Sequence, residues 1–172
     1  METAEYQLIK TAWGYAGMVV RGGALVSFYL PARRERVSGH IRARWPDAAA
    51  GRGLLPRFVQ AVQGYFLGKR ARFDVPVDLT SYTPFQRHVL EACRKIPYGK
   101  TASYKDLACA VGSPQAARGV GGVMARNPLP LVVPCHRVLH ADGSIGGFSS
   151  PEGIDEKRRL LELEGVLLPG LA

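Results

Sequence analysis

The chain has 172 residues, of which 47% are hydrophobic, 22% charged and 9% aromatic. This balance is typical of a globular protein and excludes disordered, collagen-like and low-complexity chains. No apolar run approaches the roughly 20 residues that span a bilayer. The acidic residues Glu2 and Glu5 precede the first lysine, Lys10, which is unlike an export signal. We therefore expect a soluble, cytoplasmic protein.

The three cysteines, Cys93, Cys109 and Cys135, are an odd number at wide spacings. The sequence has no CxxC pair and no Cys/His cluster with zinc-finger spacing. We therefore expect neither a disulfide framework nor a structural metal. A reducing compartment fits this cysteine usage best.

The middle of the chain carries an excess of positive charge, and its C-terminal part carries an excess of negative charge. In total, 23 Lys and Arg residues against 14 Asp and Glu residues give a net charge of +9. Residues 81–140 carry 8 basic and 2 acidic side chains, whereas residues 141–172 carry 3 and 6. The basic middle suggests a polyanion such as DNA or RNA as a partner. A basic surface that is merely solvated explains the charge equally well.

The first part of the chain predicts a small α/β domain. Residues 6–31 predict short strands with a hairpin at a Gly-Gly turn. Residues 31–53 are rich in Arg, Gly and Ala and predict a loop with broken helical pieces. An apolar stripe at helical spacing predicts a helix over 54–68, and the Pro-containing segment 69–81 predicts an extended linker.

The second part of the chain predicts short helices in close succession. Thr83 is a suitable N-cap for a helix with Pro84 at its first position, and Cys93 falls on its apolar stripe. Ser103 and Asp106 form a variant of the capping box that predicts the start of a second helix.

A third helix is expected from Ser113-Pro114 to about Arg126. A helix, a short glycine-containing turn and a helix are typical of a helix-turn-helix motif. Cys109 lies in the helix before the turn, and we interpret it as a packing residue.

Three glycines within four residues, Gly119, Gly121 and Gly122, follow Arg118 in the expected third helix. Each costs a helix about 1 kcal/mol relative to alanine, so another group is expected to approach the backbone there. In this basic segment that group is either a nucleic-acid backbone or a neighbouring helix. The glycines do not have GxGxxG spacing, and the sequence has no Walker A motif.

The reactive constellation of the sequence is Pro134-Cys135-His136-Arg137-Val138. It follows Leu131-Val132-Val133, which predicts a short buried strand. Neighbouring side chains of an extended chain point to opposite faces, so we expect a water to carry the proton between Cys135 and His136. The alternative is a buried, inert cysteine.

A nucleophilic cysteine needs activation, because with a pKa near 8.5 only about 3% of a free thiol is ionised at pH 7. A base that is itself oriented by a carboxylate would supply it, and we expect Cys135 to be held as a thiolate. Glu162 and Glu164, in a predicted helix over 157–164 that ends at Gly165, are the candidate carboxylates.

These motifs resemble those of the O6-alkylguanine-DNA alkyltransferase family. The resemblance rests on the pentapeptide 134–138, preceded by Asn127-Pro128. Four further segments match in order and spacing: Ile96-Pro97-Tyr98-Gly99, Ser103-Tyr104, Ala117-Arg118-Gly119-Val120-Gly121 and Gly146-Gly147-Phe148-Ser149. The match is strong over about residues 81–166 and loose over residues 1–76.

The resemblance implies a chemical role for five residues. Cys135 would accept the alkyl group, His136 would remove its proton through water, and Glu164 would orient the histidine. Tyr104 would hydrogen-bond the purine and help to neutralise the departing guanine. Asn127 would brace the turn beside the thiolate.

Further residues would contact the substrate or the DNA. Met124 and Val138 would line the base pocket, and Ser149 would act near the O6 oxygen. Arg118 would enter the duplex and fill the space of the flipped base. The close approach of the DNA would be permitted by the three glycines: Gly119, Gly121 and Gly122.

The fold implied is α/β, with an N-terminal α/β (RNase H-like) domain over 1–76. A mostly helical C-terminal domain with a helix-turn-helix would follow over 77–172. Family members with zinc in the N-terminal domain exist, but no cysteine precedes Cys93, so we expect no metal and no cofactor. Gly119 stands where alanine is common in the family.

The activity implied is single-turnover DNA repair. The alkyl group of O6-alkylguanine would pass irreversibly to Cys135 after the base is flipped out of double-stranded DNA. Contact would be through the minor groove and without sequence preference. A monomer is implied, while cooperative binding and the use of O4-alkylthymine stay open.

Three other functions compete with this one. A non-catalytic alkyltransferase-like protein binds lesions but lacks the acceptor cysteine, so Cys135 argues against it. A cysteine hydrolase using Cys135 and His136 would need an oxyanion hole, which nothing in the sequence marks. A helix-turn-helix regulator would bind DNA, and its thiol would be incidental.

Overall fold

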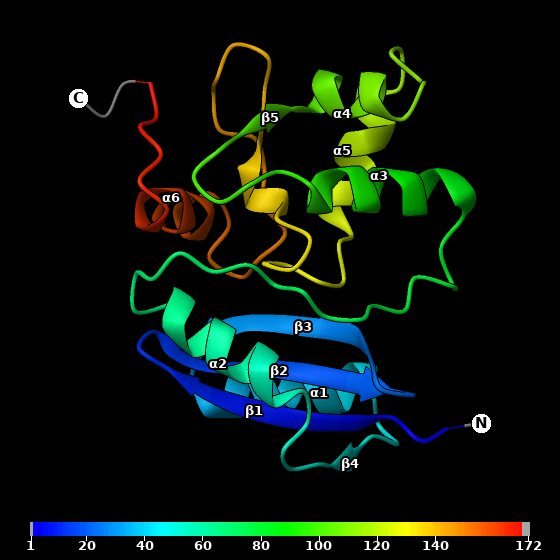
Figure 1. The fold of residues 1–172 in the computed structure, drawn as a ribbon, viewed down its shortest axis with the longest axis vertical. Helices are drawn as coiled ribbons and strands as arrows, with labels where there is room; N and C mark the ends of the chain where they lie inside the picture. The colour runs from blue at the N-terminus through cyan, green and yellow to red at the C-terminus, as the bar shows by residue number, and fades with distance from the viewer. Residues whose placement is uncertain (1, 170–172) are drawn as a thin grey trace. The chain divides into compact units, whose positions relative to one another are not determined.

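The computed structural model describes residues 2–169 and divides the chain into two compact units, Met1–Leu79 and Thr80–Ala172 (Figure 1). We call them unit 1 and unit 2. The extended segment before Leu79 packs with unit 1, because Asp78 N donates to Leu25 O at 3.0 Å and Arg21 forms an ion pair with Asp78. The expected boundary at residues 76/77 falls inside this segment.

Unit 1 is built on a four-stranded sheet in the order β3-β2-β1-β4. Its antiparallel strands are β1 (Glu5–Thr11), β2 (Gly14–Arg21) and β3 (Ala24–Ala32). The short strand β4 (Ala49–Ala50) runs parallel to the start of β1. The predicted Gly-Gly hairpin is confirmed: Gly22 and Gly23 join β2 to β3 with φ of 58° and 77°.

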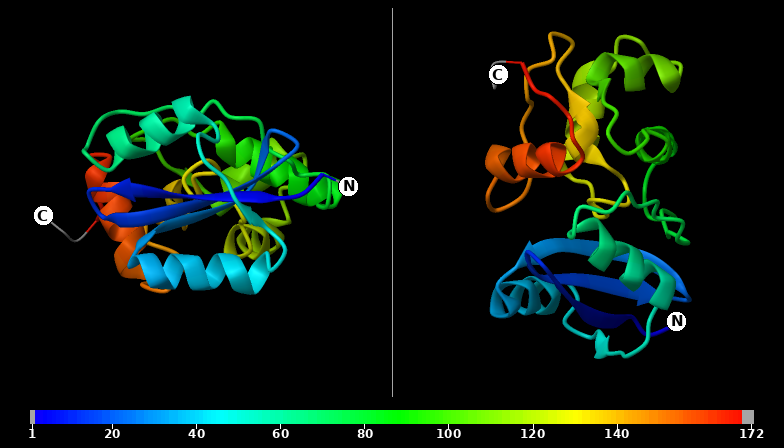
Figure 2. Two further views of the ribbon diagram at one scale, coloured as in Figure 1. Left: turned by 90° about the horizontal axis from the view of Figure 1, so that it is seen from below. Right: turned by 60° about the vertical axis from the view of Figure 1, so that its left-hand side comes forward.

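Two helices cover the opposite faces of this sheet, α1 (Arg34–Arg44) and α2 (Pro56–Tyr65) (Figure 2). The helix predicted over 54–68 is confirmed, with shorter bounds. The sequence predicts a loop with broken helical pieces over residues 31–53, but one continuous helix, α1, occupies much of the segment. Only Val37 and Ile41 of α1 are buried, so its apolar stripe is too narrow to stand out among arginines.

Unit 2 is mostly helical. Helices α3 (Pro84–Arg94), α4 (Tyr104–Ala110) and α5 (Ala117–Ala125) pack against one another. A parallel pair of short strands joins β5 (Ala102–Ser103) to β6 (Val138–Leu139). The 3₁₀ turn η1 (Cys135–Arg137) precedes β6, and α6 (Ile154–Leu163) packs on η1. Of the helices in residues 2–169, none has the length and apolarity needed to cross a bilayer.

The predicted helix starts are confirmed for α3 and α4 but not for α5. Thr83 and Ser103 each form a reciprocal capping box with the residue three positions later. Helix α5 begins at Ala117 rather than at Ser113-Pro114, because Ser113 O accepts from Ala116 N at 2.8 Å and closes a separate turn. Cys93 is buried as expected, but Cys109 is exposed, since α4 buries Leu107 and Ala108 instead.

The strand predicted at Leu131-Val132-Val133 is a buried turn. Leu131 has φ of 76°, and Val133 N donates to Leu129 O at 2.8 Å. All three side chains are buried. The apolar run therefore indicated burial correctly but not conformation, and it leads into a 3₁₀ turn instead of ending a strand.

Candidate active site

Cys135 begins the η1 turn and is only 5% exposed. Asn127 holds the chain that leads to it, since its side chain donates to Val133 O at 2.8 Å and accepts from Leu129 N at 3.0 Å. Cys135 N donates to Val133 O at 2.7 Å. One amide side chain thus fixes the buried turn on which the thiol stands.

His136 and Glu164 form a buried pair, with Nε2 and Oε1 2.7 Å apart and both side chains fully buried. Burial acts to raise the pKa of Glu164, but hydrogen bonds from His136 and Arg137 outweigh it and hold that pKa far below its usual range. Burial lowers the pKa of His136 despite the carboxylate. A neutral imidazole beside an ionised carboxylate donates through Nε2, which makes Nδ1 the basic nitrogen.

Arg137 shares the Glu164 carboxylate, and sequence reasoning assigned it no role. Its Nε and Nη2 donate to the two carboxylate oxygens, both at 2.9 Å, in the bidentate geometry that suits guanidinium. Its Nη1 donates to Ile96 O at 2.6 Å, and Gly99 N donates to Glu164 Oε2 at 3.1 Å. The Ile96–Gly99 motif therefore holds both partners of this ion pair, Arg137 through Ile96 O and Glu164 through Gly99 N.

Lys157 is a second residue that sequence reasoning missed. It is fully buried on α6, and its ammonium donates to Val138 O at 2.6 Å and lies 5.8 Å from the Tyr104 ring centre. Burial lowers the pKa of Lys157 to about 8, while the negative charge of a Cys135 thiolate would raise it. At neutral pH this cation lies in the field of the thiol without a carboxylate partner among residues 2–169.

Burial opposes ionisation of the Cys135 thiol. Burial raises its pKa, although the Asn127 amide, the Lys157 charge and local backbone hydrogen bonds act in the opposite direction. Desolvation of a buried anion therefore acts against the thiolate expected from the sequence, and the Asn127 amide and the Lys157 charge act in its favour. The proton has to leave when the substrate is bound.

The residues expected to form the base pocket differ in exposure. Met124 and Val138 are buried. Tyr104 begins α4 and packs so closely on Gly146 that a Cβ there would overlap its hydroxyl. Burial, with the nearby Cys135, raises the pKa of Tyr104 and keeps it a hydrogen-bond donor.

Ser149, expected near the O6 oxygen, is exposed in this structure. The neighbouring hydroxyl of Ser150 is buried and has no hydrogen-bond partner among the described residues. Sequence matching selected Ser149 from its place after Gly146-Gly147-Phe148, and nothing in the sequence distinguished the hydroxyl of the next residue.

Arg118 and the glycines lie on α5, away from the buried turn in sequence. Arg118 and Gly119 are exposed. A Cβ at Gly121 would meet nothing within 4 Å, and one at Gly119 would make ordinary contact with Phe85. Packing within the chain therefore does not require glycine at either position, which removes the neighbouring-helix explanation.

No metal site accompanies this chemistry in the part of the chain that the structure describes, since no three His, Cys, Asp or Glu side chains gather there in a way that could hold an ion.

Comparison with known proteins bears directly on this arrangement. Residues 84–166 match the family model described as 6-O-methylguanine DNA methyltransferase, DNA binding domain. The Mycobacterium tuberculosis methylated-DNA–protein-cysteine methyltransferase is 44% identical over 165 residues, which cover 95% of this chain and 94% of the relative. This chain belongs to the same family.

Two other family relatives extend the comparison. The crystal structure of M. tuberculosis OGT in complex with DNA superposes with a TM-score of 0.77 at 35% identity, covering 93% of this chain and 92% of that one. A DNA base-flipping protein of Thermus thermophilus is 41% identical over 134 residues, which cover 77% of this chain and 87% of the relative. The family match thus spans both units and includes one DNA-bound structure.

Proposed function

We propose that this protein repairs DNA by transferring the alkyl group of O6-alkylguanine irreversibly to its own Cys135. The observation that carries the proposal is the buried His136–Glu164 pair next to Cys135, with Nε2 and Oε1 2.7 Å apart, in a member of this family. It is the arrangement of an activated nucleophile.

The proposed transfer is a single displacement at the alkyl carbon. The Cys135 thiol gives its proton through water to His136 Nδ1, and the imidazolium is stabilised by Glu164. The sulfur then attacks the alkyl carbon, so that an S–C bond forms and the C–O6 bond breaks. The electron pair stays on guanine, which takes up a proton from solvent in place of the alkyl group, with the Tyr104 hydroxyl as a hydrogen-bond donor to the purine. The imidazolium returns the proton of the thiol to solvent. No step restores the thiol, so each protein acts once.

The remaining pocket residues complete the substrate contacts. Met124 and Val138 line the cavity for the flipped base, Asn127 braces the acceptor turn, and Ser149 acts near O6. Because the thioether-forming sulfur is buried, the nucleotide has to leave the base stack to reach it. The cost of unstacking is a few kcal/mol and is smaller for a weakly paired, damaged base.

Helices α4 and α5 are proposed to form a helix-turn-helix that binds double-stranded DNA from the minor groove. Arg118 would fill the space of the flipped base, and Gly119, Gly121 and Gly122 would let the DNA backbone approach α5. The open space beside Gly121 supports this assignment. Phosphate contacts would supply most of the affinity, without sequence preference.

The organisation proposed for the rest of the molecule is a cytoplasmic monomer without cofactor. Residues 1–76 would be the RNase H-like domain, supported by the antiparallel β1–β3 sheet between α1 and α2. Residues 77–172 would be the DNA-binding and acceptor domain.

The decisive experiment incubates the protein with duplex DNA containing O6-methylguanine, digests it and weighs the peptide that contains Cys135. We expect one added methyl group per protein, saturating at one equivalent. Cys135→Ala should keep DNA binding and lose transfer. Repeated turnover, or a methyl group on Cys93 or Cys109, would contradict the proposal.

A further inference from the structure

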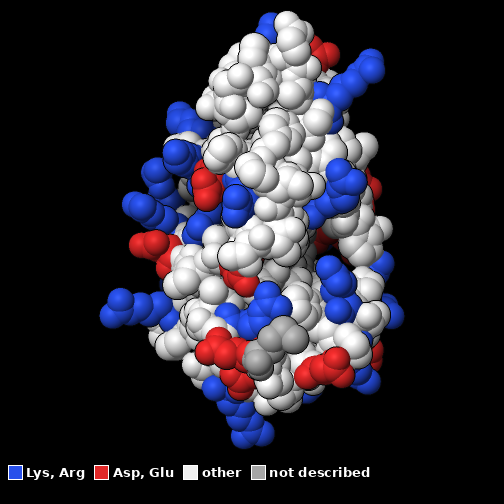
Figure 3. All heavy atoms as spheres, turned by 90° about the vertical axis from the view of Figure 1, so that its right-hand side faces the viewer, with Lys and Arg blue, Asp and Glu red and all other residues white. Residues whose placement is uncertain are grey.

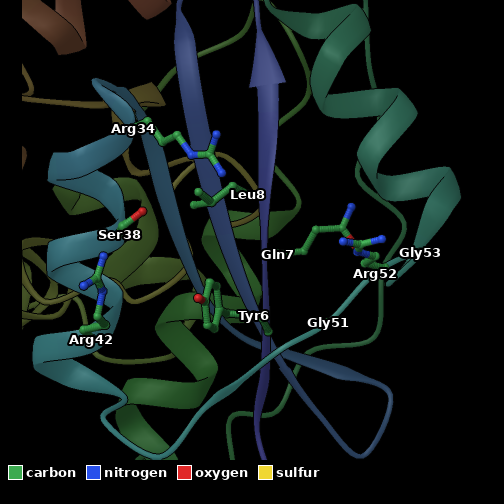
Figure 4. A pocket seen from close by; sticks show the side chains of 10 residues that line it. Tyr6, Gln7, Leu8, Arg34, Ser38, Arg42, Gly51, Arg52 and Gly53 are labelled. Atoms are coloured by element: carbon green, nitrogen blue, oxygen red, sulfur yellow. The ribbon is translucent and has the colours of Figure 1, made fainter.

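A groove of about 520 Å³ crosses unit 1 beside strand β1, outside the site described above (Figure 4). Its lining comes from α1, from β1 and from the segment after β4. The polar and apolar side chains that matter for its chemistry are Arg34, Ser38, Arg42, Tyr6, Leu8 and Arg52.

Helix α1 presents its part of the groove as one stripe. Arg34, Ser38 and Arg42 are spaced i, i+4 and i+8, so they follow one another along a single face over about 12 Å. Val37 and Ile41 are buried under the same helix and fix its rotation. The packing of α1 on the sheet therefore places both arginines on the face of the helix that lines the groove.

The three arginines of the groove are not neutralised by carboxylates. Arg34, Arg42 and Arg52 are exposed, and none forms an ion pair within residues 2–169, whereas Arg21 of the same unit pairs with Asp78 at 3.0 Å. The groove lining contains no acidic residue among those described. One carboxylate, that of Glu5, lies near the rim, 3.2 Å from the position of a Cβ on Gly51.

The arrangement of the arginines favours an extended ligand. Figure 4 shows Arg34 and Arg42 on the α1 side of β1 and Arg52 on the other side, beside Gln7. A compact anion cannot bridge both sides of a strand, but a chain of phosphates can. Guanidinium groups also bind phosphate in a bidentate fashion.

We propose that this groove is a second nucleic-acid contact, in which Arg34, Arg42 and Arg52 bind the phosphodiester backbone of DNA. It rests on the proposed function insofar as DNA is the partner, and it adds a contact made by unit 1. Basic side chains are spread over the wider surface as well (Figure 3), so the test has to separate this groove from general positive charge.

The test compares two triple variants of the full-length protein. Arg34→Ala/Arg42→Ala/Arg52→Ala removes the groove charges, and Arg57→Ala/Arg70→Ala/Arg72→Ala removes three exposed arginines elsewhere in unit 1. Each lowers the net charge from +9 by three. Binding to an undamaged duplex is measured against salt concentration. We expect the slope of log K against log salt to fall by about 2 to 3 in the groove variant and by less than about 1 in the control.

Further measurements make the outcomes distinct. Reaction of both variants with free O6-benzylguanine should match the unmodified protein, because that reaction does not use unit 1. If the unmodified protein itself fails to react, that result contradicts the proposed function but not the assignment of the groove. Equal slopes in the two triple variants would overturn the groove assignment. A small-anion site would give a different pair of results. Millimolar pyrophosphate would inhibit duplex binding only in proteins that keep the groove arginines, and the groove variant would show the same salt slope as the unmodified protein. That pair of results would also overturn the groove assignment.

Discussion

At the scale of single residues, the Glu164 carboxylate joins three groups that come from two other parts of unit 2. It accepts from His136, from Arg137 and from the backbone of Gly99. The family resemblance implied the first of these contacts, whereas the sequence pattern alone left Glu162 and Glu164 both open. The other two arise from the folded chain, since nothing in the sequence places Ile96–Gly99 against the end of α6.

Glu164→Gln should impair both chemistry and folding. The amide cannot accept two guanidinium bonds and orient His136, and it leaves Arg137 buried without a counterion. Breaking such a buried pair costs about 3 to 5 kcal/mol. We expect the free energy of unfolding in urea to fall by that order. A loss of activity with unchanged stability would show that Arg137 does not depend on this carboxylate.

Lys157→Met should slow the reaction of Cys135 while keeping most of the side-chain volume at position 157. Loss of the buried ammonium removes a group that stabilises the Cys135 thiolate. We expect the rate of reaction with O6-benzylguanine at pH 7 to fall roughly tenfold, equivalent to about 1.4 kcal/mol, and the rate to recover at higher pH. The exposed Lys105→Met is the control. A uniform loss at all pH values would mean that Lys157 acts only by packing.

The thiols of Cys109 and Cys93 should differ in reactivity. Cys109 is exposed, whereas Cys93 is fully buried and burial raises its pKa well above the usual value. A maleimide reagent should therefore label Cys109 of the native protein rapidly and Cys93 only after unfolding, which peptide mass spectrometry can follow. Rapid labelling of Cys93 in the native protein would contradict the packing described for α3.

At the scale of elements, α5 carries a cost in helix stability that its own packing does not require. Gly121→Ala should raise the free energy of unfolding by roughly 0.5 to 1 kcal/mol, because a Cβ there meets nothing within 4 Å. We expect duplex binding to weaken at the same time, as the added methyl group would occupy the space left for DNA.

Gly39→Ala in α1 is the matched control, since a Cβ there also meets open space. It should give a similar gain in thermal stability while leaving duplex binding unchanged. Unchanged binding in Gly121→Ala as well would remove the argument that the glycine run serves DNA.

Sequence patterns predicted elements well where local chemistry decides the structure. The capping boxes at Thr83 and Ser103 and the Gly22-Gly23 turn involve neighbours in the chain, so their residue types were sufficient. Helix α1 and the turn at Leu131 were missed because tertiary packing decides both. For the site, the Cys135–His136 core was recognisable by motif, whereas Arg137 and Lys157 became visible only through contacts across unit 2.

At the scale of the whole molecule, stability should fall in acid in two stages. The pKa of His136 is lowered by burial, so the unfolded chain binds its proton first, and stability is lost as the pH falls below about 6.5. The pKa of Glu164 is lowered by its hydrogen bonds, so a second loss follows below about pH 4.5.

Urea midpoints between pH 8 and pH 3 measure both losses. His136→Asn should flatten the first stage. A flat profile for the unmodified protein between pH 6.5 and pH 5 would contradict a neutral, buried His136.

Because the Glu164 carboxylate binds three groups, position 164 would be under selection for folding as well as for chemistry in laboratory evolution. A library randomised at position 164 would lose most members to misfolding and proteolysis before their chemistry could be sampled. The survivors would then report on foldability, and glutamate would be recovered even if other side chains could support transfer. A parent strengthened at remote positions, such as Gly39, would separate these two selective pressures.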